Sequence, residues 1–251
     1  MAKQKQKKDY IRLDKLLAEA GFGTRSEVKK LIAEGLVRRS GQSLTNPAER
    51  IALEQTQALT VGGTPVFWQD HYHIILNKPA DTVTALNDGR YTTVYEYLEP
   101  LYIERGLRAV GRLDLDTTGL LFFTTDGELN HRLASPKYEV AKRYYFTYSG
   151  GDMGTEEVAA FAKGINLKDE GLLRPAELEL LGPSEAILTI TQGVYHQVKR
   201  MVAAIGREVT SLERISFGPL ELSDFELEPG EYLELTEDEV RELREICKLN
   251  D

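Results

Sequence analysis

The chain has 251 residues, of which 41% are apolar and 28% charged, a balance typical of globular proteins. This length predicts one small module plus one medium domain. No stretch approaches the roughly 20 consecutive apolar residues of a membrane-spanning helix, and the basic start MAKQKQKKDY lacks an apolar signal-peptide core after it. With Cys247 as the single cysteine, we expect a cytoplasmic protein with no disulfide and no membrane partner.

The net charge of −9 argues at first against a nucleic-acid partner, because phosphate binding usually shows as a basic excess. The charge is unevenly distributed, however. Residues 1–50 carry 12 Lys plus Arg against 6 Asp plus Glu, and the remaining 201 residues carry 19 against 34. We expect residues 1–10 to form a basic, solvated tail. The case for an RNA partner therefore depends on the residues that follow this tail.

Residues 11–66 are predicted to form a small α+β module. Apolar residues from Leu13 to Ala20 follow helical spacing up to a pair of glycine stop signals. Thr24 and Glu27 then form a T-x-x-E capping box at the start of a second helix, which another glycine closes. The runs LVRRSGQSL and ALTVGGTPV are typical of strands and turns. Two short helices should therefore meet at a tight turn beside a small sheet.

Basic side chains flank these two helices and are candidate RNA ligands: Arg12, Lys15, Arg25, Lys29 and Lys30. The N-terminus of the second helix adds free backbone N–H groups for phosphate. An ordinary solvated helix face would show the same charges. The runs RLDKLL and TRSEVKKLI nevertheless resemble the paired helices of a small RNA-binding domain that a primary-binding ribosomal protein of the small subunit shares with several RNA-modifying enzymes. This resemblance implies that the module binds structured RNA.

Residues 67–73 are expected to be a linker, and residues 74–251 a second domain. HIILNKP is typical of a buried strand, and KRYYFTYSG and ILTITQG indicate further strands. TVYEYL, TEEVAAFAKGI, HQVKRMVAAIG and TEDEVRELREICKLN favour helices, and Asp126-Gly127 favours a hairpin turn. There is no glycine-rich phosphate loop and no regular crossover spacing. We therefore predict an α+β fold with a mixed or antiparallel sheet rather than a doubly wound one.

Four blocks follow one another along this domain: LNKP, GRLDLDTTGLLFFTTDGELNHRL, AKRYYF and GVYHQVKRMVAAIG. In this order they resemble the pseudouridine synthases of small-subunit and large-subunit ribosomal RNA, over nearly the whole chain. The resemblance implies that the aspartate of RLD, here Asp114, is the catalytic nucleophile. It also implies that no cofactor is needed, because the reaction breaks the glycosidic bond of uridine, rotates the uracil and rejoins it through carbon 5.

The same resemblance gives roles to residues in the other blocks. An ionised carboxylate in a dry pocket needs a cationic neighbour, and by resemblance Lys199 supplies it. Tyr144 is expected to stack on the flipped uracil, and Arg112 to brace the RNA that the base has left. Arg200 and His196 are expected to contact the substrate, although a hydrogen-bonded structural role suits His196 equally well.

Several neighbouring residues are expected to be structural. Tyr145 lies on the opposite strand face from the pocket tyrosine and is expected in the core. Residues 117–119 should shape the turn that presents the nucleophile, Gly119 by adopting backbone angles closed to other residues. The four histidines show no metal-site spacing, so we predict no metal. Asp81, where relatives usually carry glycine, and Val194, where arginine is common, depart from the family pattern and bear on RNA contacts.

The identity of the RNA is indicated by HQVKRM, since large-subunit relatives usually carry RQVRRM instead. We therefore predict that a monomer modifies one uridine of 16S rRNA or of a small-subunit assembly intermediate. Three alternatives stay open: a pseudouridine synthase of 23S rRNA, a glycosidase with Asp114 and Asp116 as its acid and base, and a non-catalytic rRNA-binding assembly factor. The sequence does not choose between attack of the nucleophile on the uracil ring and attack on the ribose.

Overall fold

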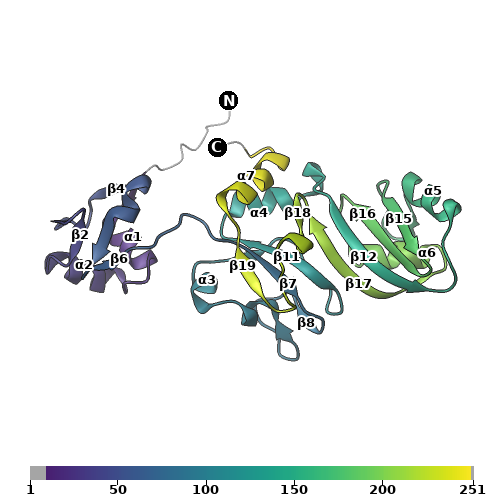
Figure 1. The fold of residues 1–251 in the computed structure, drawn as a ribbon, viewed down its shortest axis with the longest axis horizontal. Coiled ribbons are helices and arrows are strands. Elements are labelled where there is room, and N and C mark those ends of the chain that lie inside the picture. The colour runs from purple at the N-terminus through teal and green to yellow at the C-terminus, as the bar shows by residue number, and fades with distance from the viewer. Residues whose placement is uncertain (1–9, 250–251) are drawn as a thin grey trace. The chain divides into compact units, whose positions relative to one another are not determined.

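The chain divides into two compact units, residues 1–70 and 71–251, in a computed structural model that describes residues 10–249 (Figure 1). The division falls within the stretch 67–73 that was expected to be a linker. The expected tail lies outside the described residues except for Tyr10, which instead belongs to a strand and pairs with Ala52. No helix in the described part of the chain is long and apolar enough to cross a membrane.

The N-terminal unit packs two helices, α1 (Leu13–Glu19) and α2 (Arg25–Ala33), with two small sheets. The predicted capping box starts α2, because the Thr24 side chain accepts from the backbone N–H of Glu27 and the Glu27 carboxylate accepts from the backbone N–H of Thr24. The remaining elements are β1 (Tyr10–Arg12) paired with β4 (Arg50–Ala52), the 3₁₀ helix η1 (Leu53–Ala58), and the sheet β3 (Gln42–Ser43), β2 (Val37–Arg39), β5 (Leu59–Val61) and β6 (Thr64–Pro65).

A nine-stranded sheet forms the centre of the described part of the second unit. Its main order is β15-β16-β12-β17-β11-β7-β19, with β10 beside β11 and β18 beside β17. Only the pairing of β11 with β17 is parallel, so the predicted mixed sheet of an α+β fold is confirmed. The strands are β7 (His73–Lys78), β10 (Arg108–Ala109), β11 (Thr118–Thr124), β12 (Lys142–Ser149), β15 (Glu177–Gly182), β16 (Glu185–Ile190), β17 (Glu208–Phe217), β18 (Leu220–Glu221) and β19 (Tyr232–Glu234).

Helices cover both faces of this sheet. Side chains alternate along β7, so that Ile74 and Leu76 pack in one core and Ile75 in the other. The first core includes side chains of α3 (Pro100–Glu104), α5 (Thr155–Lys163) and α6 (Gln197–Ala204), and the second includes side chains of α4 (Gly127–Ala134) and α7 (Glu237–Ile246). The shorter elements are β8 (Thr82–Val83), β9 (Thr92–Thr93), η2 (Val94–Tyr97), η3 (Pro136–Tyr138), β13 (Asn166–Leu167), β14 (Gly171–Leu172) and η4 (Leu222–Asp224).

The sheet opens between β11 and β17. These strands pair through only two residues on each side, Thr118 and Gly119 with Glu213 and Arg214. A loop enters β11 directly before this short pairing, and β12 lies on the far side of β17. The loop before β11 therefore lies beside this short pairing of β11 with β17.

Two local predictions were wrong. Asp126-Gly127 is not a hairpin turn: the Asp126 carboxylate accepts the backbone N–H groups of Glu128 and Leu129 at 3.0 and 3.1 Å and so caps the N-terminus of α4. Asp before Gly suits either structure, and the amphipathic run after it decides for the helix. TVYEYL begins no α-helix and forms only the 3₁₀ turn η2.

Tyr145 was also placed wrongly. It is only partly buried, whereas Tyr144 is 8% exposed and belongs to the main core. The alternation along β12 was foreseen, but the side that faces the pocket is also the side that packs against helices. Strand periodicity predicts which side chains share a face of β12. It does not predict that the pocket and the helix-packed core lie on the same face.

His73, the first residue of β7, makes stability depend on pH. Its Nδ1 lies 3.0 Å from Thr124 Oγ1, its ring stacks on Phe122, and burial lowers its pKa from 6.5 to about 4. The unfolded chain binds a proton at His73 near pH 6.5, whereas the folded protein does not. The contribution of His73 to the free energy of unfolding is therefore present above pH 6.5 and is lost as the pH falls toward 4. We expect urea unfolding to show about 2 kcal/mol less stability at pH 5 than at pH 7, with the loss absent in His73→Asn. An equal loss in the variant would contradict this assignment.

Candidate active site

Asp114 lies in the loop that joins β10 to β11, with its side chain 28% exposed. The loop turns back on itself through a hydrogen bond from the backbone N–H of Thr117 to the carbonyl of Asp114, at 3.2 Å. Thr84 fixes the residue before the nucleophile: its Oγ1 donates to the carbonyl of Leu113 at 3.0 Å and accepts from the N–H of Leu113 at 3.2 Å. The backbone on both sides of Asp114 is therefore held in place.

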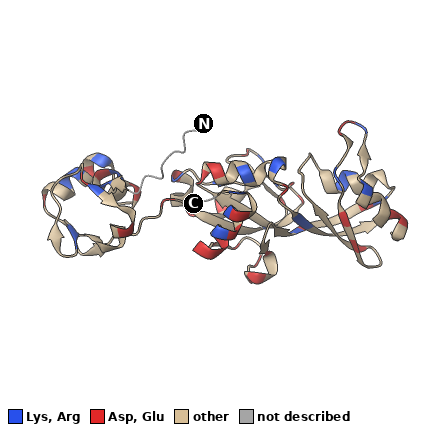
Figure 2. Ribbon diagram, turned by 90° about the horizontal axis from the view of Figure 1, so that it is seen from above, with Lys and Arg blue, Asp and Glu red and all other residues tan. Residues whose placement is uncertain are grey.

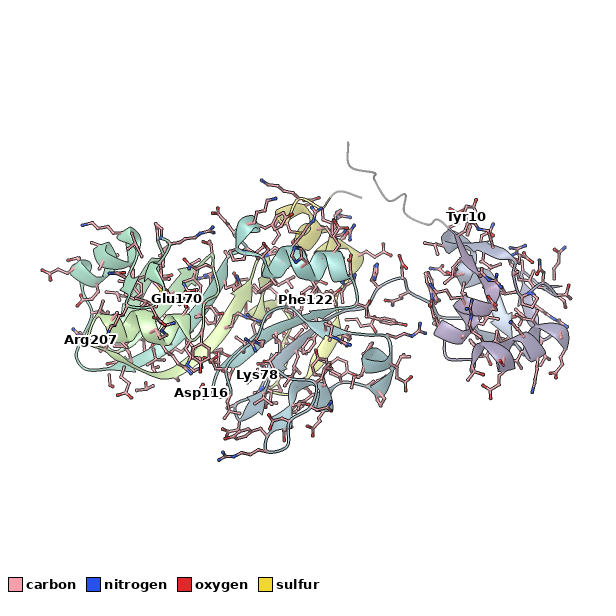
Figure 3. All side chains as sticks on the ribbon, turned by 180° about the vertical axis from the view of Figure 1, so that it is seen from behind. Tyr10, Lys78, Asp116, Phe122, Glu170 and Arg207 are labelled. Carbon is pink, nitrogen blue, oxygen red and sulfur yellow. The ribbon has the colours of Figure 1, made fainter. Side chains whose placement is uncertain are left out.

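Lys78, the last residue of β7, anchors the same loop through hydrogen bonds. Its side chain is fully buried, and its ammonium donates to the carbonyls of Thr117 at 2.7 Å, Pro79 at 3.0 Å and Leu115 at 3.3 Å. Burial lowers the pKa of Lys78 to about 8, and the negative charges of Asp116 and Asp114 act against this shift. Figure 3 labels Lys78 and Asp116, which lie in this region of the second unit. Lys78 of the LNKP block, to which the sequence gave no role, therefore holds the loop of Asp114.

We expect Lys78→Met to lower kcat by about 10- to 100-fold, because the loop loses its anchor and the precise position of its carboxylate. The variant should also lose about 1–3 kcal/mol of unfolding free energy, since three carbonyls lose a donor. Single-turnover assays and urea unfolding measure the two effects. Lys163→Met, which removes an exposed lysine from α5, is the control. If Lys78→Met and the control show the same kcat, Lys78 does not position the loop.

A cation and a histidine contact Asp114. Lys199 Nζ lies 3.5 Å from Asp114 Oδ2 and 2.5 Å from Asp116 Oδ1, and His196 Nε2 lies 3.4 Å from Asp114 Oδ1. Burial pulls the pKa of Asp116 upward, but hydrogen bonding to Lys199 and its positive charge outweigh burial and leave that pKa below its ordinary value. The predicted partnership of Asp114 with Lys199 is present, with Asp116 as a second acceptor for the same ammonium.

The segment before α6 presents His196 toward the loop. His196 has a φ of 50°, in the left-handed region, and its ring stacks on Tyr195 with 3.8 Å between centroids. Tyr195 is 70% exposed. Gln197 holds the segment by accepting the backbone N–H of Val194 at 3.1 Å. The Tyr195 ring of this stacked pair is therefore largely exposed.

Gly119 allows β11 and β17 to lie in close contact. Its φ is 95°, and a Cβ built there would lie 2.4 Å from the carbonyl oxygen of Arg214. Both observations exclude a side chain at this position. The predicted need for glycine after the nucleophile is confirmed, with close strand contact as a second reason for it.

A cavity of about 560 Å³ opens beside the nucleophile. Its walls come from the loop before β11, from β12 and β17, and from the segment before α6. Tyr144 and Arg112 line it together with Asp114. Tyr144 is buried and Arg112 is exposed. Its further polar or aromatic lining residues include Thr117, Lys142, Tyr195, His196, Arg214 and Phe217.

Arg200 takes a different position from the one expected. It forms ion pairs with Asp169 and Glu170, in the turn between β13 and β14, and donates to the carbonyl of Tyr195 at 3.1 Å. It does not line the cavity. Figure 3 labels Glu170, which lies in this turn. Arg200 thus ties the segment before α6 to a neighbouring turn, and sequence adjacency to Lys199 does not bring it to the nucleophile.

The five basic residues predicted to bind RNA fall into two groups. Asp14, which is buried, binds Arg12 at 3.0 Å and Arg25 at 3.3 Å and so fixes both guanidinium groups, and Lys15 pairs with Glu19 at 3.4 Å. The exposed lysines of α2, Lys29 and Lys30, form no ion pair among the described residues. In Figure 2 the ribbon of the N-terminal unit is blue at Lys and Arg and red at Asp and Glu.

Four residues of the site received no role from the sequence: Lys78, Thr84, Lys142 and Arg214. Two of them carried a usable signal. Lys142 opens the block KRYYF, and Arg214 sits between Leu212 and Ser216 at the inward positions of a strand, where a charge calls for an explanation. One departure from the family pattern is also accounted for, because Asp81 has a φ of 59°, a conformation that Asp adopts more readily than most residues with a side chain.

Comparison with known proteins agrees with this geometry. Residues 71–204 match the family model of RNA pseudouridylate synthase, and residues 11–56 match that of the S4 domain. The chain is 39% identical over 239 residues to an uncharacterised RNA pseudouridine synthase of Bacillus subtilis, covering 94% of this chain and 99% of the relative. It is 38% identical over 233 residues to ribosomal small subunit pseudouridine synthase A of Escherichia coli, covering 92% and 98%.

A crystal structure of a pseudouridylate synthase shares 36% identity and a TM-score of 0.65, covering 93% of this chain and 99% of that one. The family model spans the loop of Asp114, the strand of Tyr144 and all of α6 with Lys199. An S4 domain followed by this catalytic domain accounts for both units. The chain therefore belongs to the RNA pseudouridylate synthase family, whose members are isomerases that act on RNA.

Proposed function

We propose that this enzyme converts one uridine of 16S rRNA to pseudouridine, with Asp114 as the nucleophile. The observation that carries the proposal is a partly buried carboxylate at the wall of a cavity of about 560 Å³, contacted by Lys199 and His196, with Tyr144 in the wall of the same cavity. The choice of the small subunit rests on relatives from several bacteria that are named ribosomal small subunit pseudouridine synthase A. We further propose that the protein acts as a cytoplasmic monomer on an assembly intermediate.

The chemistry follows from these positions. A target base inside structured RNA must leave its stack to reach a carboxylate in a cavity, and the ring of Tyr144 offers a face on which it can stack. Arg112, exposed at the cavity and next to Leu113, is placed to contact the RNA outside. Lys199, 3.5 Å from Asp114 Oδ2, orients the carboxylate, and the ester that Asp114 forms holds one fragment while the uracil turns. The proton lost from carbon 5 balances the one gained at nitrogen 1.

The N-terminal unit is proposed to hold the rRNA through its basic residues, including Lys29 and Lys30. We expect the double variant Lys29→Glu/Lys30→Glu to weaken rRNA binding by about 10- to 100-fold and to reduce the salt dependence of log Kd by roughly 0.7–0.9 for each phosphate that the variant no longer binds. The control is Lys163→Glu/Lys248→Glu, with the same charge change on the second unit. Filter binding at several salt concentrations gives both quantities. Equal losses in the two double variants would show a general charge effect instead of a docking face.

The proposed function is tested with the full chain and four substrates: transcribed 16S rRNA, transcribed 23S rRNA, a partly assembled small subunit and the mature small subunit. Pseudouridine is mapped by carbodiimide-blocked primer extension. We expect one new stop in 16S rRNA, strongest in the partly assembled subunit. A stop in 23S rRNA alone would overturn the assignment to the small subunit, and a stop in none would overturn the activity.

The same experiment separates the two rival activities. A glycosidase would release free uracil, which chromatography of the reaction detects, and would leave an abasic site in place of pseudouridine. The structure speaks against Asp116 as its second carboxyl, because Asp116 is held by Lys199 and its side chain is 68% exposed. A non-catalytic assembly factor would bind the rRNA and leave every uridine unchanged.

A further inference from the structure

Two buried polar atoms of the described residues have no hydrogen-bond partner, the hydroxyl of Thr117 and Nη2 of Arg214. Both residues are 1% exposed, and both line the cavity of the nucleophile. Leaving a buried donor unpaired costs free energy, so such atoms in a native protein call for an explanation. Their presence in the walls of one cavity indicates a polar ligand that completes them.

Arg214 also has no negative partner in the part of the chain that the structure describes. Its Nε donates to the carbonyl of Leu120 at 2.6 Å, and its guanidinium carbon lies 5.2 Å from the centre of the Phe217 ring. Lys142 Nζ lies 5.7 Å from the centre of the same ring and donates to the carbonyl of Val140 at 3.0 Å. Neither cation forms an ion pair among the described residues. Two cations thus flank one aromatic ring in the wall of a substrate cavity, an arrangement that favours a ligand with negative charge.

Burial and the charge of Arg214 lower the pKa of Lys142 to about 8. Bringing two cations together in a poorly solvated place is unfavourable, so the apo enzyme carries a cost that an anionic group would relieve. The cost is localised at the wall formed by β12 and β17, on strands separate from the loop of Asp114.

The depth of Arg214 selects between the two parts of an RNA that could bear this charge. A phosphodiester is tied to nucleotides on both sides and stays where the strand can pass, whereas Arg214 is almost completely buried. A flipped base is the part of the substrate that can be inserted into the cavity as far as Arg214. Its carbonyl oxygens O2 and O4 are the acceptors that a guanidinium N–H and a hydroxyl can reach there.

We propose that Arg214 and Thr117, with Lys142, form an oxyanion site that binds a uracil carbonyl oxygen and stabilises the negative charge that this oxygen gains during the reaction. The inference rests on the proposed pseudouridine synthase activity and adds catalytic residues to it. Arg214 and Thr117 are satisfied by the substrate and not by the protein, which explains why both lack partners in the free enzyme.

This role holds for either route of attack. If Asp114 attacks the ribose, the electron pair of the glycosidic bond leaves with the uracil, and the resulting anion spreads over O2 and O4. If Asp114 adds to carbon 6 of the ring, the electron pair of the ring double bond moves onto the O4 enolate. Donors fixed in advance around that oxygen lower the barrier in both cases, since they are stronger toward the charged state than toward neutral uridine.

The first test compares Arg214→Met and Thr117→Val with wild type in single turnovers on the mapped RNA. We expect rates about 100-fold lower for Arg214→Met and about 10-fold lower for Thr117→Val, with the Kd for RNA within about 3-fold of wild type. Arg143→Met, which removes an arginine of the same sheet that pairs with Glu221, is the control and should keep its rate. Thr117→Val should also unfold at the same or a higher urea concentration, because it removes a hydroxyl without a partner. Thr117→Val therefore still tests the proposal if Arg214→Met fails to fold.

The second test replaces the target uridine by 2-thiouridine or 4-thiouridine, since sulfur is a weaker hydrogen-bond acceptor than oxygen. If Arg214 binds one of these oxygens, the rate ratio of wild type to variant should shrink to below about 3-fold with the matching thio base, because the contact is already weakened. Unchanged ratios with both thio bases would overturn the proposal. Weaker RNA binding with a lower salt slope, at an unchanged rate, would assign Arg214 to a phosphate and overturn it as well. Absence of pseudouridine with wild type is a separate outcome, which overturns the proposed function itself.

Discussion

Asp114→Asn is expected to abolish pseudouridine formation, with a loss of at least about 1,000-fold in the single-turnover rate. The amide keeps the size of the side chain and can still accept a hydrogen bond from Lys199, which lies 3.5 Å from Asp114 Oδ2. It lacks the negative charge that attacks carbon, however, so the covalent step fails while the RNA still binds. Quench-flow assays of the rate and filter binding of the RNA together show this split.

The control for this prediction is Asp116→Asn, two residues away in the same loop. Asp116 shares Lys199 with the nucleophile, but its side chain is 68% exposed. We therefore expect a loss of less than about 10-fold, caused by the changed setting of Lys199. Equal losses at the two positions, or a normal rate with Asp114→Asn, would contradict the assignment of the nucleophile.

Lys199→Met is expected to give the second-largest loss, about 100- to 1,000-fold in kcat. The ammonium bridges two carboxylates, and without it two negative charges face each other in a partly buried place. Protonation of the pair then becomes easier, so the acidic limb of the pH–rate profile should move to higher pH.

Lys199→Arg separates charge from shape. It keeps the positive charge, and we expect it to stay within about 10-fold of wild type with its acidic limb unshifted. Lys163→Met, far along the chain on α5, controls for the loss of a lysine as such. A pH–rate profile of Lys199→Met that is lower but unshifted would mean that Lys199 contacts the substrate without acting on the carboxylate.

The fold was predictable where the signals are local. Capping boxes at Thr24 and Thr236 start α2 and α7, as their T-x-x-E patterns indicate. The order of the strands was not predictable in the same way, because it depends on contacts such as the parallel pairing of Gly119 with Arg214, residues far apart in sequence. Asp126 shows the limit within one turn, since the same two residues serve a hairpin or a helix start.

The residues of the site were likewise predictable only where the signal is local in sequence. Asp114, Tyr144 and Lys199 were found because each lies in a block with a recognisable order of residues. Lys78 and Arg214 were missed because their partners are distant: Lys78 binds carbonyls 37 and 39 residues away, and Arg214 binds one 94 residues away. Arg200 shows the opposite error, since its neighbour in sequence is at the nucleophile and its own side chain is bound elsewhere.

The central claim is that Asp114 bonds covalently to the substrate, and mass spectrometry tests it directly. An RNA with 5-fluorouridine at the mapped position cannot lose a proton from carbon 5, so the reaction should stall with the enzyme attached. After quenching and digestion, we predict that the tryptic peptide from Leu113 to Arg132 carries the nucleotide on Asp114, and that Asp114→Asn carries none. A nucleotide found on Asp116 or on any other residue of the wild-type enzyme would contradict the account.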